Sequence, residues 1–243
     1  MKSFPAGLAG LAMLAASPSF AGDASTLNIL GFDAEGGVFA FEEYGIQDGS
    51  GFPFANRFYI DTAGDTFLPG TPIRVRIESD GALGDLAEAR GQARDQGEAI
   101  MPDAELEANF GFTAAYSPFT DLSSDPHRMT INPRPVVPAV DEPVEFRLTE
   151  FQTTAGEICS GLSETMAGFR LVRVGLEPGA ETVLVHEDAS VPASRTCPLG
   201  YRIGAVQTFF PEAGDPVYVV LVQVRSLGFE GPNHRWIAIP GRL

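Results

Sequence analysis

Three histidines are the residues of this sequence best suited to metal ligation or proton transfer: His127, His186 and His234. Neutral imidazole is a common zinc ligand, and an imidazole beside Ser, Asp or Glu acts as a general base. No two of the three lie within one short motif, so their spacing by itself predicts neither a metal centre nor a catalytic triad. They are candidate metal ligands only if the fold gathers them with carboxylates, and no cofactor is expected.

Two loops combine glycine, aromatic rings and charge, the composition of a binding surface carried on a rigid sheet. They span residues 48–57 and 227–235, and we call them the Gly-Phe loops. The alternative is that their phenylalanines plug the core, as aromatic side chains commonly do. The candidate binding residues in and beside these loops are Glu43, Asp48, Phe52, Phe54, Arg57, Phe229, Glu230, His234 and Arg235.

Several chemistries are excluded because Lys2 is the only lysine. A Schiff-base enzyme, a P-loop nucleotide site and a kinase-type phosphate clamp each need that amine. The sequence also contains no G-x-S-x-G, H-E-x-x-H, C-x-x-C or G-x-G-x-x-G motif. We therefore expect a non-catalytic protein.

The N-terminal residues predict that the chain is exported. Residues 1–21 contain Lys2, an apolar run and then Ser19-Phe20-Ala21, the pattern of a cleaved secretory signal peptide. The apolar run is too short to span a bilayer, so we expect residues 22–243 to form one soluble domain, periplasmic or secreted, with no membrane segment.

The charge of the predicted mature chain limits its partners. Fifteen arginines face 32 acidic residues, a formal charge of −17. A field of that sign repels phosphate backbones and anionic lipid, which argues against nucleic-acid binding and membrane docking. An unidentified protein or small molecule remains as the partner, and cationic partners stay compatible with the charge. The simpler alternative is that the charge only maintains solubility.

Cys159 and Cys197 are the only cysteines. In an exported chain, an even pair predicts a disulfide bond. The alternative, a catalytic thiol beside a histidine such as His186, would need a reducing compartment, which export argues against.

From residue 27 onward, short apolar segments alternate with Gly, Pro, Asp and Asn clusters, which predicts a mainly β protein. In the strand 38–44, Glu42 and Glu43 should point to opposite faces, one exposed and one paired with arginine, with Arg57 the candidate partner of Glu43. The run 217–222 is apolar on both faces and should be a central strand. The remaining strand candidates are 57–61, 71–78, 144–151, 169–176, 182–186, 202–210 and 235–239.

Helical signal is scarce. Residues 82–100 form the one expected helix, peripheral to the sheets, with Leu83, Leu86, Ala87, Arg90 and Ala93 at helical spacing. The proline-rich segment 110–143 is expected to be an ordered, irregular crossover, because proline interrupts both helices and central strands.

The two ends of the predicted mature chain resemble one another, with a turn, a strand, a Gly-Phe loop and an Arg-aromatic strand in the same order. Chance similarity between β-hairpins is the alternative to a duplication. The first copy also resembles a strand pair of the periplasmic TolB-type β-propellers. We therefore expect antiparallel sheets arranged like propeller blades or like a sandwich, with the two hairpins side by side.

Over most of its length, the chain resembles a family of predicted secreted bacterial proteins, domain of unknown function 2259. The matching segments are F-A-F-E-E-Y-G-I-Q-D-G-S-G at 39–51, C-P-L-G-Y-R-I at 197–203 and G-F-E-G-P at 228–232, together with Arg235, Gly241 and Arg242. The resemblance implies export and a β-rich domain, and it transfers no catalytic residues.

Three functions stay open from the sequence. The first is a non-catalytic periplasmic binding or interaction module. The second is an accessory to zinc handling in the cell envelope, which requires the three histidines to cluster with carboxylates. The third is a hydrolase, which requires a polar cleft that holds His186 or His234 within hydrogen-bond reach of a Ser, Asp or Glu.

Overall fold

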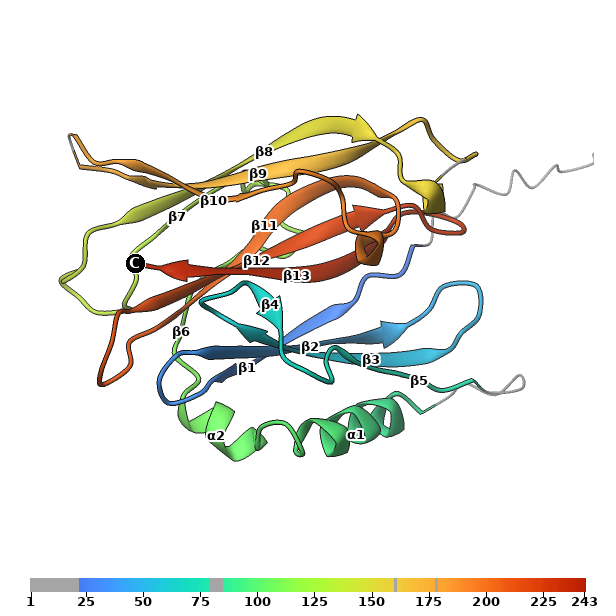
Figure 1. Ribbon diagram of the computed structural model, residues 1–243, viewed down its shortest axis with the longest axis horizontal. Coiled ribbons are helices and arrows are strands. Elements are labelled where there is room, and N and C mark those ends of the chain that lie inside the picture. Colours follow the sequence, from blue (N-terminus) through green and yellow to red (C-terminus); the bar gives the residue numbers. More distant parts are fainter. Residues whose placement is uncertain (1–21, 79–84, 160, 178) are drawn as a thin grey trace, which may run out of the picture.

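The structure is a computed structural model that describes residues 22–78, 85–159, 161–177 and 179–243. The predicted signal peptide lies outside the described residues. The described strands form three antiparallel sheets stacked as layers, which confirms the predicted mainly β class (Figure 1). The layers match the sandwich alternative, whereas propeller blades would surround a common axis.

The first layer is the N-terminal sheet. Its strands lie in the order β1-β2-β3-β4, with β5 also paired to β3: β1 Thr26–Phe32, β2 Val38–Ile46, β3 Pro53–Asp61, β4 Thr66–Phe67 and β5 Ile73–Arg76. The middle layer is the central sheet, in the order β13-β12-β11-β6: β6 Phe112–Tyr116, β11 Pro198–Phe209, β12 Val217–Ser226 and β13 Asn233–Arg242. The third layer is the outer sheet, in the order β10-β9-β8-β7: β7 Arg128–Ile131, β8 Val144–Thr154, β9 Thr165–Gly175 and β10 Thr182–Glu187.

Strand β12 shows why the central sheet is the middle layer. Tyr218 and Val220 point into a core shared with the outer sheet, whereas Val219 and Leu221 point into a core shared with the N-terminal sheet. Successive side chains of a strand face opposite ways, so an unbroken apolar run must be covered twice. The prediction that this strand is central is confirmed.

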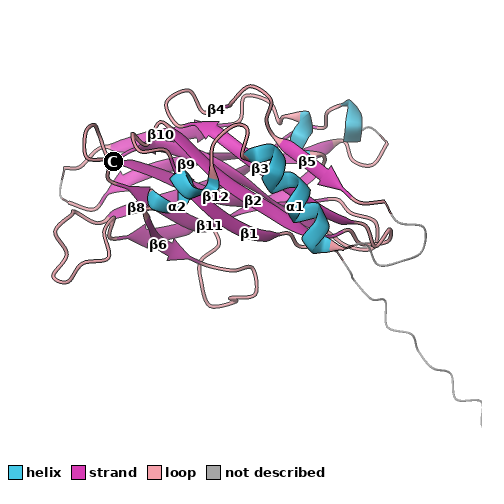
Figure 2. Cartoon of the chain, turned by 90° about the horizontal axis from the view of Figure 1, so that it is seen from below, coloured by secondary structure: helices cyan, strands magenta, loops and turns pink. Residues whose placement is uncertain are grey.

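Two helices, α1 Leu86–Gly97 and α2 Asp103–Ala108, cover the free face of the N-terminal sheet (Figures 1 and 2). Ala89 and Ala93 are buried against it, and a Cβ placed on Gly97 would lie 2.3 Å from the Tyr59 hydroxyl. Small residues therefore allow the close approach of α1. The peripheral helix was predicted, and its predicted face is correct in part: Ala93 is buried and Arg90 pairs with Glu42 of the sheet, whereas Ala87 is exposed and the buried Ala89 was not predicted. Predicted Leu83 lies outside the described residues.

The segment 110–143 is not wholly irregular, because it contains β6 and β7. Both are short edge strands, where prolines before and after them remove no hydrogen bond from a central ladder. The two similar hairpins, β2-β3 and β12-β13, are neighbours in different layers. They meet face to face through Phe41, Phe58, Leu221 and Trp236 and do not lie side by side in one sheet.

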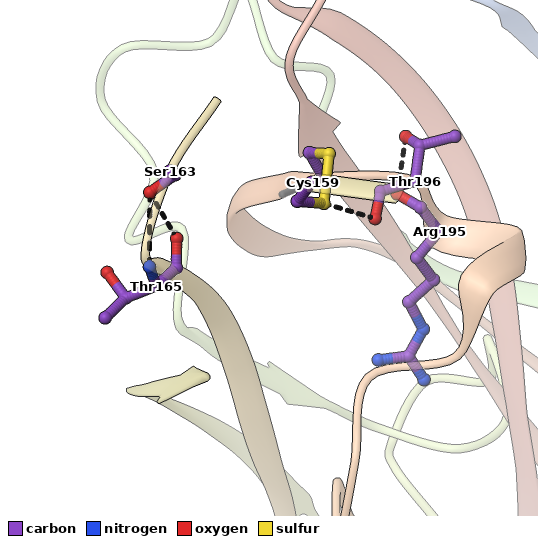
Figure 3. The surroundings of a disulfide bond; sticks show 6 residues. Cys159, Ser163, Thr165, Arg195 and Thr196 are labelled. Atoms are coloured by element: carbon purple, nitrogen blue, oxygen red, sulfur yellow. Dashed lines mark hydrogen bonds between the residues drawn. A yellow bond between two sulfur atoms is a disulfide. The ribbon is translucent and has the colours of Figure 1, made fainter. Parts of the chain in front are cut away.

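The predicted disulfide joins Cys159 to Cys197, with Cα atoms 5.6 Å apart. Cys159 ends the short 3₁₀ helix Glu157–Cys159 between β8 and β9, and Cys197 directly precedes β11, so the bond links the outer sheet to the central sheet. A second 3₁₀ helix, Ala193–Arg195, lies just before Cys197. Figure 3 shows the Arg195 side chain extending away from the disulfide.

Candidate functional site

A cleft lies between β4 of the N-terminal sheet and β13, the edge strand of the central sheet. Its larger part has a volume of about 390 Å³, and an adjoining part has about 190 Å³. We call it the edge cleft. Both parts share the lining residues Phe58, Phe67, Ser194, Arg195, Trp236 and Ile237.

Aromatic rings form the apolar lining of the edge cleft. Phe58 stacks on Phe41 with ring centroids 4.5 Å apart, and Phe67 lies 6.0 Å from Phe58. The Trp236 indole is held by its N–H, which donates to the carbonyl of Ser25 at 3.1 Å. Phe58 and Trp236 are buried, but Phe67 is 49% exposed on the two-residue strand β4. A rigid wall thus faces an accessible aromatic side chain.

The backbone of β13 supplies hydrogen-bonding groups to this cleft. The N–H of Trp236 points away from β12, because it donates to the Glu43 carboxylate at 2.9 Å. Strand alternation then directs the N–H and C=O of Ala238 outward as well. Among the described residues these groups have no backbone partner. Pro240, the next outward residue, has no N–H to offer.

One end of the edge cleft carries a charged network. His186 Nε2 lies 2.9 Å from Asp188 Oδ1, and Arg195 Nη1 donates to both Asp188 oxygens at 2.8 Å. Asp188 also accepts the N–H of Phe169. Burial would raise the pKa of Asp188, but the hydrogen bonds from His186 and Phe169 and the charge of Arg195 lower it. Asp188 is therefore an ionised anchor for the cleft wall.

Asp65 faces the same network from the turn before β4, with Oδ2 4.0 Å from His186 Nδ1. Burial of this carboxyl raises its pKa, against the opposing charges of His186 and Arg195. Both nitrogens of His186 thus face carboxylates. Within the described residues, no serine or cysteine donates a hydrogen bond to this ring. His186 thus lies within hydrogen-bond reach of Asp188, the contact that the hydrolase alternative requires. Ser194 lines the same cleft, but no hydrogen bond joins it to His186 among the described residues.

The structure separates the predicted pair Arg57 and Glu43, so that prediction is wrong. Arg57 binds Asp103 of α2 through two hydrogen bonds, of 2.6 and 2.8 Å, because its side chain lies on the helix-facing side of the N-terminal sheet. Glu42 lies on that same side and pairs with Arg90 of α1. Glu43 faces the central sheet, as the predicted alternation requires, but both glutamates are buried, and neither is the exposed one that was predicted.

The two Gly-Phe loops meet in space. A Cβ placed on Gly49 would lie 3.5 Å from the Phe229 ring, and the Arg235 guanidinium covers the Phe54 ring at 4.6 Å. Phe54 is buried, as the core alternative has it, whereas Phe229 is 83% exposed.

The other loop candidates have separate surroundings. Arg235 pairs with Asp23 and lines the second part of the edge cleft together with Glu43. Phe52 lies under Arg76 at the cation–π distance of 5.9 Å. Asp48 has one buried carboxylate oxygen without a hydrogen-bond partner among the described residues, and Glu230 is exposed.

The three histidines do not gather. His127 and His234 line one pocket, and His186 lies in the edge cleft. No group of three or more His, Cys, Asp and Glu in the described parts of the chain is arranged to hold a metal ion. The condition set for a zinc protein is therefore not met.

Sequence reasoning missed most residues of the edge cleft, among them Asp65, Phe67, Arg195 and Ala238. Phe67 carries the one recognisable signal, a phenylalanine inside an otherwise polar turn region, D-T-F at 65–67. The other three acquire their position only from the packing of layers.

A family model described as predicted secreted protein, DUF2259, matches residues 40–242. The chain belongs to this family. The DUF2259 assignment confirms the family resemblance and agrees with an exported protein. Comparisons with curated proteins and with solved structures gave no match. In the part of this DUF2259 chain that the structure describes, the helices are too short and too polar to cross a membrane.

Proposed function

We propose that this protein is a non-catalytic binding module of the periplasm, and that it takes an extended apolar peptide segment of a partner protein in the edge cleft. One observation carries the proposal: the outward backbone groups of β13 at Ala238 lie in the lining of an aromatic cleft. An exposed strand edge is a template for a further strand.

The register of the added strand follows from the groups beside Ala238. The N–H of Trp236 already donates to the Glu43 carboxylate, and Pro240 has no N–H. The segment therefore pairs with Ala238 at its centre and ends within a few residues on either side. Backbone hydrogen bonds of this kind supply affinity, and pockets for alternate side chains supply specificity.

The cleft walls favour apolar side chains on the bound segment. Phe67 offers an exposed aromatic face, and Ile237 and Ile239 line the same space. The charge of −17 on residues 22–243 attracts a basic partner and repels an acidic one. The proposed ligand is thus a strand-forming segment with alternating apolar and basic residues.

Trp236 provides a direct test, because it is the only tryptophan of the chain and lines both parts of the edge cleft. Its fluorescence is titrated with a synthetic heptapeptide that alternates valine and arginine. The same peptide, N-methylated at every peptide bond, offers no amide N–H to a strand edge and is the ligand control. A saturable change with the first peptide and none with the second supports strand addition, and equal responses overturn it.

Two matched variants locate the site. Phe67→Asp places a charge inside the edge cleft, and Phe229→Asp places the same charge on an exposed phenylalanine outside it. We expect at least tenfold weaker peptide binding for Phe67→Asp and unchanged binding for Phe229→Asp. Equal affinities would place the peptide elsewhere. Mass spectrometry of the recovered peptide tests the hydrolase alternative, which predicts cleavage where the binding module predicts an intact peptide.

A further inference from the structure

A second pocket, of about 340 Å³, lies on the central sheet. It shares no lining residue with the larger part of the edge cleft. Three adjacent strands contribute Arg202, Gln223, Arg225 and His234 to it, and Phe119 of the segment after β6 covers it. We call it the arginine pocket. Its residues meet because Arg202 pairs in register with Gln223, and Arg225 with His234.

The two arginines of this pocket belong to a minority in this acidic protein, together with Arg74, Arg173 and Arg242, that has no carboxylate within 4 Å among the described residues. Most arginines in the described parts of the chain lie within 4 Å of a carboxylate, as in the pairs of Arg57, Arg90, Arg134, Arg195 and Arg235. Within the same residues, Arg202 and Arg225 have no such partner. Arg202 donates to the hydroxyls of Ser117 and Ser124, at 3.0 and 3.4 Å, and its Nε is buried without a partner. Arg225 donates to the carbonyl of Leu199.

Gln223 contributes a hydrogen-bond acceptor to the pocket, beside the donors of Arg202 and Arg225. Its side chain lines the pocket, the residue is only 2% exposed, and its Oε1 atom is buried with no hydrogen-bond partner among the described residues. A buried polar atom without a partner costs free energy, of the order of 1–3 kcal/mol. A ligand that donates a hydrogen bond here would remove that cost.

The electrostatic environment of the pocket is positive on one side. Burial and the charges of Arg225, Arg235 and Arg202 lower the pKa of His234, although Asp23 acts in the opposite direction. The His234 ring stacks on Phe119, with centroids 5.3 Å apart, and so forms a flat wall.

Acidic groups face the pocket from the other side. Glu150 accepts the N–H of Tyr201 and lies 3.7 Å from His127 Nε2, and Asp121 acts on Arg202 from a greater distance. The pocket therefore presents cationic donors and neutral or anionic acceptors together.

We propose that the arginine pocket binds a small carboxylate that bears a hydrogen-bond donor, amino or hydroxyl, on the neighbouring carbon. The guanidinium groups of Arg202 and Arg225 receive the carboxylate, as planar forked donors do in proteins. The amino or hydroxyl group donates to the acceptors of the same lining, the Gln223 side-chain amide and the Glu150 carboxylate. The stacked rings of Phe119 and His234 form the wall against which the rest of the ligand packs.

The test uses NMR of the imidazole protons in the protein of residues 22–243. His127 and His234 line the pocket, and His186 in the edge cleft is an internal control. The probes are alanine, lactate, acetate and inorganic phosphate at constant ionic strength. We expect saturable shifts of His127 and His234, with His186 unmoved, for alanine or lactate, and at least tenfold weaker binding for acetate and phosphate.

Which of alanine and lactate binds distinguishes an amino donor from a hydroxyl donor. Equal shifts of all three histidines, no shift with any probe, or equally tight acetate and phosphate would overturn the proposal.

A matched pair of variants tests the arginines. Arg225→Gln removes one charge from the exposed rim of the pocket, and Arg94→Gln removes one charge from the exposed face of α1. We expect at least a tenfold loss of affinity for Arg225→Gln and none for Arg94→Gln. Equal affinities would assign the binding to overall charge and overturn the site. Peptide binding in the edge cleft should not change in either variant, so the two proposals fail separately.

Discussion

The buried carboxylate of Glu43 accepts the backbone N–H of Trp236 at 2.9 Å, although 193 residues separate the two in the sequence. Glu43 lies on β2, and Trp236 lies on the edge strand of the central sheet. The same carboxylate accepts hydrogen bonds from Ser25 and Asn56, at 3.2 and 3.0 Å. One side chain thus joins two layers and the residues just before β1, and it lines the second part of the edge cleft.

Glu43→Ala should lower the free energy of unfolding by about 2–4 kcal/mol, because it leaves several buried donors without an acceptor. The measurement is urea denaturation followed by Trp236 fluorescence. Glu107→Ala on the exposed face of α2 is the control and should change stability by less than about 0.5 kcal/mol. Similar losses in both variants would contradict the anchoring role of Glu43.

Removal of the disulfide should destabilise the protein by about 3–4 kcal/mol, the entropy of a closed loop of this length in the unfolded chain. The cysteines are 38 residues apart. The double variant Cys159→Ala, Cys197→Ala is compared with the oxidised protein by urea denaturation. Because Arg195 lies two residues before Cys197, peptide binding in the edge cleft should also weaken in the double variant. Unchanged stability would show that the bond does not constrain the unfolded chain.

Stability should fall steeply in acid. The pKa of Asp188 is lowered from 3.8, and the pKa of Glu145 is lowered from 4.5 by Arg128 and Arg147, although burial opposes both shifts. A carboxyl with a lowered pKa stabilises the fold above its ordinary pKa, and this contribution is lost as the pH falls through the folded value. Urea midpoints between about pH 6 and pH 2.5 should therefore drop below about pH 4.

Asp188→Asn identifies one source of that loss. The variant should be less stable at neutral pH, because the ion pair with Arg195 is gone, and its stability should depend less on pH in acid. An acid profile that runs parallel to that of the unaltered protein would assign the effect to other carboxyls.

Asp65→Asn should stabilise the fold at neutral pH, whereas Asp188→Asn should destabilise it. Burial raises the pKa of Asp65 from 3.8 despite His186 and Arg195, so the ionised form is disfavoured in the fold at neutral pH. The variant should raise the melting temperature at pH 7, and the gain should disappear as the pH falls below the ordinary value. Asparagine tolerates the φ of 48° at this position, which keeps the turn intact. Asp95→Asn on α1 is the exposed control, and a lower melting temperature for Asp65→Asn would contradict this assignment.

Local patterns were sufficient for much of the fold. The strand alternation placed Glu42 and Glu43 on opposite faces, and the two-sided apolar run placed β12 in the middle layer. The partners were not accessible in the same way. Arg57 pairs with Asp103, 46 residues further along, because the six-residue helix α2 packs against β1 on the helix-facing side of the N-terminal sheet. No periodicity in the sequence encodes that contact.

The sequence by itself determined the mainly β class, the disulfide pair and the family. It also excluded reactions that need a lysine amine, because Lys2 is the only lysine. These conclusions depend on residue type and on nearest neighbours along the chain. The tertiary structure alone decided which groups share a site. The edge cleft combines β4, β13 and the segment before Cys197, and the arginine pocket combines β11, β12 and β13. Such sites depend on the order and stacking of sheets, which long-range packing of the two cores sets and which local sequence patterns leave open.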